Sequence, residues 1–331
     1  MKLGAFIVPT GIGASIGGFA GDASKWARKI SKKHKLIVNP NVVNAACFSG
    51  ITENMLYVEG FTLDEFFKGN CYLKESSNNN IGVVFDKAIS QEALNIHINT
   101  INAVKTVYDI NISSYITTDE NVGVNFFIDK TGISTGNVKN LLTIKKAAEK
   151  LLKKGCNAIA IVCKFPEEQG EDYANGIGVD PVGGVEAIIS HYISKELRVP
   201  CAHAPAFEDT SIGHKVVDPR CAAEYITPTF LPCILLGLAQ APYITNKEGH
   251  SINDVDFLVI PYNAIGSISV LEADKRKIKI FAIKENNTVL NITPVNFNIK
   301  CDIIGTYEEL LELIWKKLQK KAFLLRRFLF Q

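Results

Sequence analysis

The sequence predicts an α/β protein with a mainly parallel sheet flanked by helices, in two halves of similar size. Short apolar runs of strand length alternate with longer helical patterns along all 331 residues, which is typical of parallel strands linked by helices. Hydrophobic residues make up 47% of the chain, enough for a large core. We expect the halves to span 1–155 and 156–305, followed by an amphipathic helix over 306–331.

In the first half, the predicted strands are apolar runs that stop at polar or glycine-containing loops: 6–8, 35–38, 54–59, 81–85, 115–118 and 122–128. The predicted helices carry apolar residues at helical spacing: 23–33, 62–68, 91–108 and 141–154. Gly155 follows the last of these and is placed to end it, because glycine tolerates the left-handed conformation found just past a helix.

The second half repeats this alternation. Its predicted strands are again short apolar runs: 158–164, 200–207, 255–261, 267–271 and 277–284. Helices are predicted over 182–197 and from about Thr306, and the segment 221–239 is helical only in part because Pro228 and Pro232 interrupt it.

Composition excludes several classes of protein. The net charge of +2 gives no electrostatic case for a nucleic-acid partner. The eight cysteines include no C-x-x-C pair, so we expect reduced thiols in the cytoplasm or a plastid stroma. Pro9 and the glycines after it interrupt any signal-peptide core, and the apolar run 230–242 is too short to span a bilayer. We therefore expect a soluble protein.

A glycine-rich loop follows the first predicted strand, with five glycines in eleven residues before a helix. Strand, glycine loop and helix together bring backbone N–H groups close to a bound phosphate or carboxylate. A nicotinamide dinucleotide would need an acid at the end of the next strand, where Asn39 stands instead. The alternatives are a tight turn made by the glycines and a helix cap made by Asp22. The candidate substrate-binding residues are Thr10, Gly11, Gly13, Gly17, Gly18, Asp22 and Asn39.

A second glycine-containing helix start lies at Asp180-Pro181-Val182-Gly183-Gly184. Asp180 resembles a helix cap followed by proline at the first helical position. Gly183 and Gly184 each cost a helix about 1 kcal/mol, which close approach by a ligand or another backbone would offset. Glu186 and Ser190 share one helix face, with His191 beside them. The candidate substrate-binding residues are Asp180, Gly183, Gly184 and His191; the alternative is simple helix packing with a solvated His191.

The third candidate is His203, which lies in an extended run of small residues near a strand end. The flanking alanines leave room around its ring, which suits a general acid or base with a near-neutral pKa. Glu186 or Glu59 is the expected partner carboxylate. The alternatives are a core histidine, a Cys201–His203 nucleophilic pair, and a metal site using His191, His203 and His214, whose spacings match no known pattern.

These segments resemble a family known as domain of unknown function 3326, found mostly in cyanobacteria and plastid-bearing lineages. The resemblance is carried by the following stretches: 7–13 with Gly17-Gly18 and Gly21-Asp22, 39–41, 57–60, 178–181 with Gly183 and Glu186, 200–205, 229–233 and 285–288. It covers about residues 3–295, and from Cys301 the chain departs from the family pattern. The resemblance implies no particular activity.

The residues together predict a cofactor-independent metabolic enzyme that acts on a small anionic substrate by general acid/base chemistry, as a hydrolase, lyase or isomerase. The first glycine loop and the Gly183-Gly184 turn would bind the phosphate or carboxylate. Two other hypotheses remain, a non-catalytic ligand-binding or regulatory protein and a nucleotide-dependent enzyme. No cofactor or metal is expected, with a nucleotide or a divalent metal as lesser alternatives.

The C-terminal helix mixes apolar residues with lysines. We expect it to pack on the body or on a second subunit of a homo-oligomer rather than to lie on a membrane, because apolar residues occupy more than a narrow stripe near its end.

Overall fold

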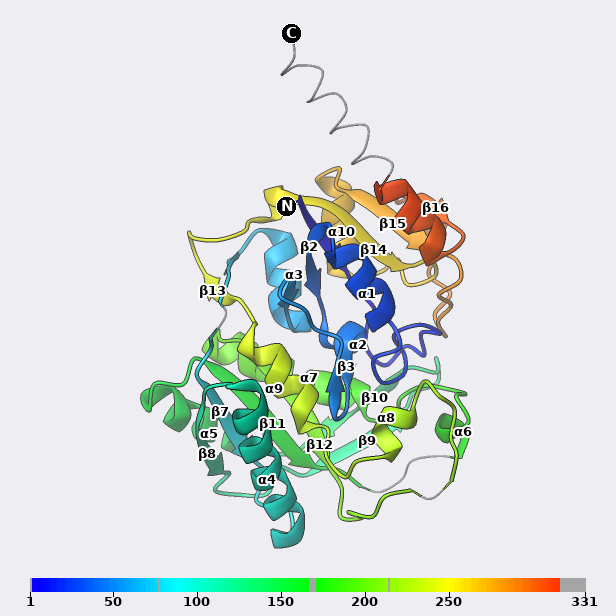
Figure 1. The fold of residues 1–331 in the computed structure, drawn as a ribbon. Helices are drawn as coiled ribbons and strands as arrows, with labels where there is room; N and C mark the ends of the chain where they lie inside the picture. The colour runs from blue at the N-terminus through cyan, green and yellow to red at the C-terminus, as the bar shows by residue number, and fades with distance from the viewer. Residues whose placement is uncertain (1, 77, 167–170, 214, 316–331) are drawn as a thin grey trace.

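The computed structural model describes residues 2–76, 78–166, 171–213 and 215–315. Two parallel sheets dominate it, one above the other in Figure 1, so the α/β prediction is confirmed. The larger sheet has six strands in the order β16-β15-β14-β1-β2-β5. Its strands are β1 (Lys2–Phe6), β2 (His34–Val38), β5 (Met55–Tyr57), β14 (Val255–Pro261), β15 (Lys279–Ile283) and β16 (Asp302–Ile304).

The smaller sheet has four strands in the order β12-β11-β7-β8, all parallel. They are β7 (Ile81–Phe85), β8 (Ile112–Thr117), β11 (Ala158–Lys164) and β12 (Cys201–Ala206). In both sheets the strand order changes direction in the middle, between β1 and β14 and between β7 and β11. Such points leave a crevice at the carboxyl ends of the strands, where open α/β sheets bind ligands.

The larger sheet is built from the two ends of the chain, and the smaller sheet is built from the segment between them. The strands therefore do not divide at the predicted boundary near residue 155. Residues 2–57 and 255–304 supply the first sheet, and residues 81–206 supply the second. The apolar alternation could not reveal this, because it marks strands without saying which sheet each one joins.

Each sheet is buried on both faces, which explains why its strands read as continuous apolar runs. Along β1, Phe6 faces the central core, whereas Leu3 and Ala5 face the opposite side. That outer face is covered by α3 (Gly60–Lys68) and α10 (Ile268–Lys275). The outer face of the smaller sheet is covered by α5 (Leu141–Lys153) and α7 (Gly183–Leu197).

The central core contains α1 (Ser24–Ser31), α4 (Gln91–Tyr108) and α9 (Leu231–Ala239). Helix α9 lies between the sheets in Figure 1 and packs on β11 and β12. On its other side Gly237 contacts Tyr57 of β5 so closely that a Cβ would lie 2.7 Å from the ring. The apolar α9 therefore joins both sheets into one core.

The predicted strand at 267–271 is wrong. Ser267 caps the helix α10 by accepting a hydrogen bond from Val270 N at 3.4 Å. The segment is short and apolar, and such runs fit a strand or a buried helix equally well. The sequence predicts the strand β9 (Val124–Ile128) but not its pairing with β10 (Ser134–Val138). It predicts neither of the other two small pairings, β3 (Asn44–Ala45) with β4 (Phe48–Ser49) and β6 (Tyr72–Lys74) with β13 (Tyr243–Thr245).

The remaining short elements are α2 (Pro40–Val43), α6 (Glu171–Ala174), α8 (Ala222–Tyr225), and the 3-10 turns η1 (Ile252–Asp254) and η2 (Pro294–Phe297).

Residues 307–315 form the described part of the C-terminal helix, and they pack on the body. Tyr307 is fully buried, stacks on Trp26 with ring centres 5.3 Å apart, and accepts a hydrogen bond from Asn286. The rest of the predicted helix, 316–331, lies outside the described residues, so the alternatives of a second subunit and a membrane remain predictions for that part.

The hairpin of β9 and β10 connects the two sheets through backbone contacts. Ser134 N donates to Gly11 O at 2.8 Å, and Gly11 has φ +74°, which favours glycine. The first turn of α7 also lies against Ser134, since a Cβ at Gly184 would be only 1.9 Å from Ser134 O. Close approach by another backbone is thus what requires this glycine inside a helix.

We predict that Gly184→Ala destabilises the protein by about 1–3 kcal/mol or more, because the helix must move away from β10. Helix propensity alone would give the opposite sign, a gain of about 1 kcal/mol. Chemical denaturation measures the difference. Gly266→Ala is the control, because its Cβ would meet no atom closer than 3.5 Å; a Gly184→Ala protein as stable as the wild type would contradict this packing.

Candidate functional site

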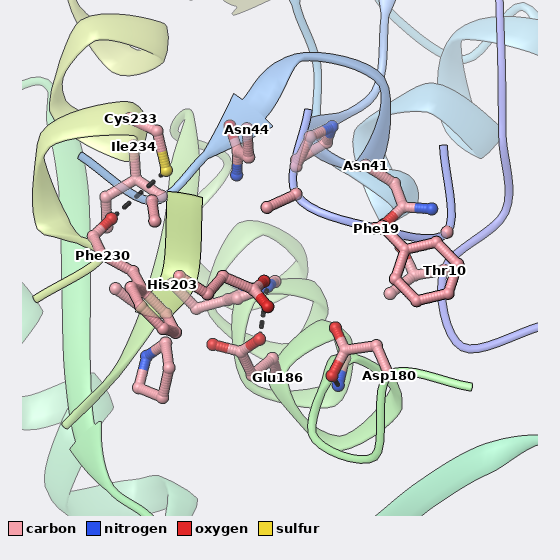
Figure 2. A pocket seen from close by; sticks show the side chains of 18 of the residues that line it. Thr10, Phe19, Asn41, Asn44, Asp180, Glu186, His203, Phe230, Cys233 and Ile234 are labelled. Atoms are coloured by element: carbon pink, nitrogen blue, oxygen red, sulfur yellow. Dashed lines mark hydrogen bonds and ion pairs between the residues drawn. The ribbon is translucent and has the colours of Figure 1, made fainter. Parts of the chain in front are cut away.

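A cavity of about 80 Å³ lies between the carboxyl ends of the two sheets. It has room for several water molecules or a small organic molecule. Figure 2 shows Asp180, Glu186 and His203 around it, with Thr10 and Asn41 from the larger sheet's loops. The structure thus brings together residues from all three predicted constellations: Thr10, Gly18, Asp180, Gly183, Glu186 and His203.

His203 projects from β12 and is held by α7. Its Nδ1 lies 2.9 Å from Ser190 Oγ, and Ser190 Oγ donates to Ala187 O at 3.3 Å. A hydroxyl has one proton to donate and the Ala187 carbonyl only accepts, so we assign Nδ1 as the donor to Ser190. The other ring nitrogen, Nε2, is then unprotonated and free to act as a base.

Glu186 reaches the same ring from one turn earlier on α7. Its Oε2 lies 3.9 Å from His203 Nε2, and its Oε1 is buried without a hydrogen-bond partner. Burial lowers the pKa of His203 to about 3, with a further lowering from His191. Burial also raises the pKa of Glu186 well above its usual range, and Asp180 adds to that rise. Burial therefore favours an uncharged imidazole facing a protonated carboxyl group.

Two more carboxyl groups line the cavity. The pKa of Glu224 is raised to about 8. Burial is the main cause and Asp180 adds to the rise, while a hydrogen bond with Tyr173 acts against it. Burial also raises the pKa of Asp180, although its Oδ1 accepts from Val182 N at 3.0 Å and Gly183 N at 3.2 Å. None of the described residues that line this cavity is a lysine or an arginine.

The glycine loop uses its N–H groups within the protein. Gly17 N donates to Asp22 Oδ1 at 2.6 Å, and Ile16 N donates to Asn286 Oδ1 at 3.0 Å. Helix α1 begins with Ala23 as its cap and has no side-chain cap, so Asp22 closes the loop instead of capping that helix. Burial raises the pKa of Asp22 to about 6, although the hydrogen bond from Gly17 acts to lower it.

Asn39 is likewise engaged in the fold. Its Oδ1 accepts from Val8 N at 3.0 Å and its Nδ2 donates to Val8 O at 2.7 Å, which holds the end of β1 against β2. Gly11, Gly13, Gly17, Asp22 and Asn39 are not among the residues that line the cavity. They shape the loop that presents Thr10 and Gly18.

The start of α7 also has its donors occupied. Asp180 accepts from the first turn, and Gly184 N donates to Ser134 Oγ at 3.1 Å. Gly183 lines the cavity, and a side chain there would collide with Asp180, whose carboxylate oxygen lies 2.8 Å from the Cβ position. Gly184 faces β10 instead. An anion bound at the N–H group of Gly17, Gly183 or Gly184 would therefore have to displace a hydrogen bond made within the protein.

Glu59 and His191 form a separate pair outside the cavity lining. Both carboxylate oxygens of Glu59 cap α3, accepting from Phe61 N at 2.8 Å and Thr62 N at 2.5 Å. His191 Nε2 lies 3.8 Å from Glu59 Oε2, and its side chain is 46% exposed. Of the two carboxylates expected to partner His203, the structure therefore places Glu186 beside it.

Two alternatives for His203 find little support in the geometry. Burial raises the pKa of Cys201 well above its usual range, which keeps the thiol protonated and a poor nucleophile. Within the described parts of the chain, no three or more His, Cys, Asp or Glu side chains are grouped so that they could hold a metal ion. His214 lies outside the described residues.

Sequence reasoning missed Glu224, Tyr173 and Phe230, which also line the cavity. Glu224 lies on the short helix α8 between a cysteine and a proline, with no glycine loop or histidine nearby to mark it. A lone acid within an otherwise apolar segment was the only available signal, and it is a weak one.

Comparisons with known proteins place this chain among cyanobacterial relatives. A family model described as a protein of unknown function, DUF3326, matches residues 4–320, so the match continues past Cys301, where the sequence pattern predicts a departure. A Synechococcus protein named an uncharacterized lipoprotein is 39% identical over 313 residues, covering 92% of this chain and 87% of that protein. No solved structure matches significantly. None of the helices in the described ranges has the length and hydrophobicity of a membrane span.

We predict that His203 stays neutral, with its proton on Nδ1, between pH 5 and 8, because its pKa is about 3. Nitrogen-15 NMR of labelled histidine distinguishes the two neutral tautomers and the cation. Ser190→Ala removes the acceptor of Nδ1–H and should shift the tautomer balance. A His203 signal that titrates near pH 6.5, like a free histidine, would contradict the assignment.

We predict that the free energy of unfolding falls as the pH rises from 6.5 to 8. Glu224 keeps its proton up to about pH 8 in the folded protein but loses it near pH 4.5 when unfolded, so the folded state binds more protons in this window. His203 has the opposite sign, because its folded pKa is about 3 while an unfolded histidine still loses protons above pH 6.5, but its contribution of about 0.4 kcal/mol is smaller and is shared by wild type and variant. In Glu224→Gln, which cannot ionise, the loss should be smaller by about 2 kcal/mol.

Chemical denaturation at each pH measures this difference. Glu308→Gln, at an exposed site, is the matched control and should keep the wild-type slope. An equal slope in Glu224→Gln and the wild type would show that Glu224 titrates normally.

Proposed function

We propose that this chain, which belongs to the DUF3326 family, is an enzyme that transfers protons to and from a small polar substrate in the cavity between its sheets. One observation carries the proposal. An unprotonated ring nitrogen, His203 Nε2, and a buried carboxyl group with a raised pKa, Glu186, lie 3.9 Å apart at the cavity wall. A base and an acid that both reach one small reacting group are what general acid/base catalysis requires.

The reaction uses both members of the pair. His203 Nε2 takes a proton from the substrate, and the electron pair left behind moves to a neighbouring atom. That atom takes the Glu186 proton, so no net charge is left on the substrate. The imidazolium and the carboxylate then lie 3.9 Å apart, and a proton passing back through product or water restores the starting state. The balance fits an isomerase, or a lyase whose second product leaves the cavity.

Burial sets the strength of both groups. A low dielectric disfavours the ion pair that forms in mid-reaction, but each charge of that pair neutralises the other at short range. Ser190 stabilises the imidazolium, because its oxygen already accepts from Nδ1–H. The helix α7 thus carries both the acid and the group that orients the base, four residues apart on one face.

The proposal does not carry forward the anionic substrate predicted from the glycine loops, which remains a prediction. The hydrogen bonds of Gly17, Gly183 and Gly184 within the protein are the reason. The glycines act on the site indirectly, by shaping the loop at Thr10 and by admitting α7 next to β10.

Solvent deuterium exchange at carbon tests the proposal, because hydrogens on nitrogen and oxygen exchange with water unaided, whereas exchange of a C–H hydrogen requires a catalysed proton transfer. We predict that the protein in D₂O introduces deuterium into at least one member of a panel of small amines, amino acids, hydroxy acids and oxo acids, measured by mass spectrometry. His203→Gln and Glu186→Gln should each slow that exchange by about 10²–10⁴-fold.

His250→Gln is the control, because His250 pairs with Glu75 at 2.6 Å on the β6–β13 side of the molecule. A panel member that stabilises the protein against heat but undergoes neither exchange nor conversion would favour a ligand-binding protein without turnover.

A further inference from the structure

We infer that the substrate of this site carries a protonated nitrogen, as an ammonium or amidinium group, held by Asp180 and Glu224 beside the Glu186–His203 pair. The inference rests on the proposed function, because it names the substrate class of the same cavity. The juxtaposition that carries it is three carboxyl groups around one small cavity whose described lining residues include no lysine or arginine.

The three carboxyl groups act on one another. Asp180 raises the pKa of both Glu186 and Glu224, and Glu224 raises that of Glu186. Asp22 lies close enough to add to the effect on Glu224. Arg220 lies over the ring of Phe19, a residue of the cavity lining, and pairs with Asp218 at 3.0 Å. A cation bound among these carboxyl groups would favour their ionised forms and so offset the effect that they have on one another.

Glu186 supplies an independent observation. Its residue surface is only 8% exposed, yet Oε1 has no hydrogen-bond partner, and the side chain points into the cavity in Figure 2. A buried polar atom without a partner costs about 1–3 kcal/mol. Proteins retain such atoms where a ligand completes the hydrogen bond, so Oε1 is the open position of this site.

An organic cation fits better than a metal ion or an anion. The described carboxyl and imidazole groups are not grouped closely enough to share one metal ion. The N–H groups of Gly17, Gly183 and Gly184 already donate to Asp22, Asp180 and Ser134. An ammonium group supplies several N–H donors of its own, which matches a wall of carboxyl oxygens.

A second, larger cavity gives the substrate a direction. It measures about 320 Å³ and shares Pro205, Glu224 and Phe230 with the inner one. Phe207 and Tyr225 add apolar surface to it. The charged nitrogen therefore occupies the inner cavity, and the rest of the molecule extends past Glu224 toward the outer cavity.

Calorimetry on the full-length protein tests the inference. The probes are ethylammonium, butane-1,4-diammonium and guanidinium, compared with acetate, phosphate and magnesium, all at millimolar concentration. The titrations are made at neutral pH in two buffers that lack small cations and differ in heat of ionisation. We expect the cationic nitrogen probes to bind and to release protons, because their charge drives ionisation of the protonated carboxyl groups.

Asp180→Asn and Glu224→Gln should each weaken that binding by about tenfold or more. Both keep their size, and the asparagine oxygen can still accept from Val182 and Gly183, so folding is retained. Glu308→Gln should bind like the wild type.

The outcomes are distinct. Failure of every nitrogen cation to bind overturns the inference, as does binding of acetate, phosphate or magnesium that is lost in Glu224→Gln. Deuterium exchange into an anionic compound would also overturn it while leaving the proposed function standing. Ammonium binding with no exchange in any compound would instead overturn the proposed function and leave the cation site intact.

Discussion

The contact on which the rest of the structure depends is the backbone approach of α7 to β10. Gly184 lies against the Ser134 carbonyl with no space for a side chain, and the Ser134 N–H joins the carbonyl of Gly11. One residue of the hairpin thus holds both the start of α7 and the first glycine loop. Because Glu186 and Ser190 follow on the same helix, this contact also decides where they meet His203.

The chemistry of the site follows from enclosure more than from any unusual residue. Glutamate and histidine are ordinary side chains, and in water one would be ionised and the other would titrate near neutrality. Between the two sheets, burial favours the protonated form of Glu186 and the neutral form of the His203 imidazole. The serine on α7 adds direction, since it determines which ring nitrogen faces the cavity.

Much of the fold could be predicted from the sequence because strands buried on both faces read as unbroken apolar runs. The bounds of β7, β11, β14 and α4 agree with those predicted, and Gly155 has the expected positive φ. The strand predicted at 267–271 was wrong because a short apolar run fits a strand and a buried helix equally well. The pairing of residues 2–57 with 255–304 was beyond reach, since it depends on contacts between distant parts of the chain.

The site was predictable to a similar degree. His203, Glu186 and Asp180 were marked by glycines, small neighbours and helix spacing, and they meet in one cavity. Glu224 was not, because an acid gains significance only from the groups that surround it in space. The order of the strands also has a consequence during synthesis. The four-stranded sheet can assemble as soon as β12 leaves the ribosome, but β1 must wait for β14 to cover its open side. Until then β1 presents an unpaired apolar edge, so a nascent chain of this protein stays exposed to aggregation until late in translation.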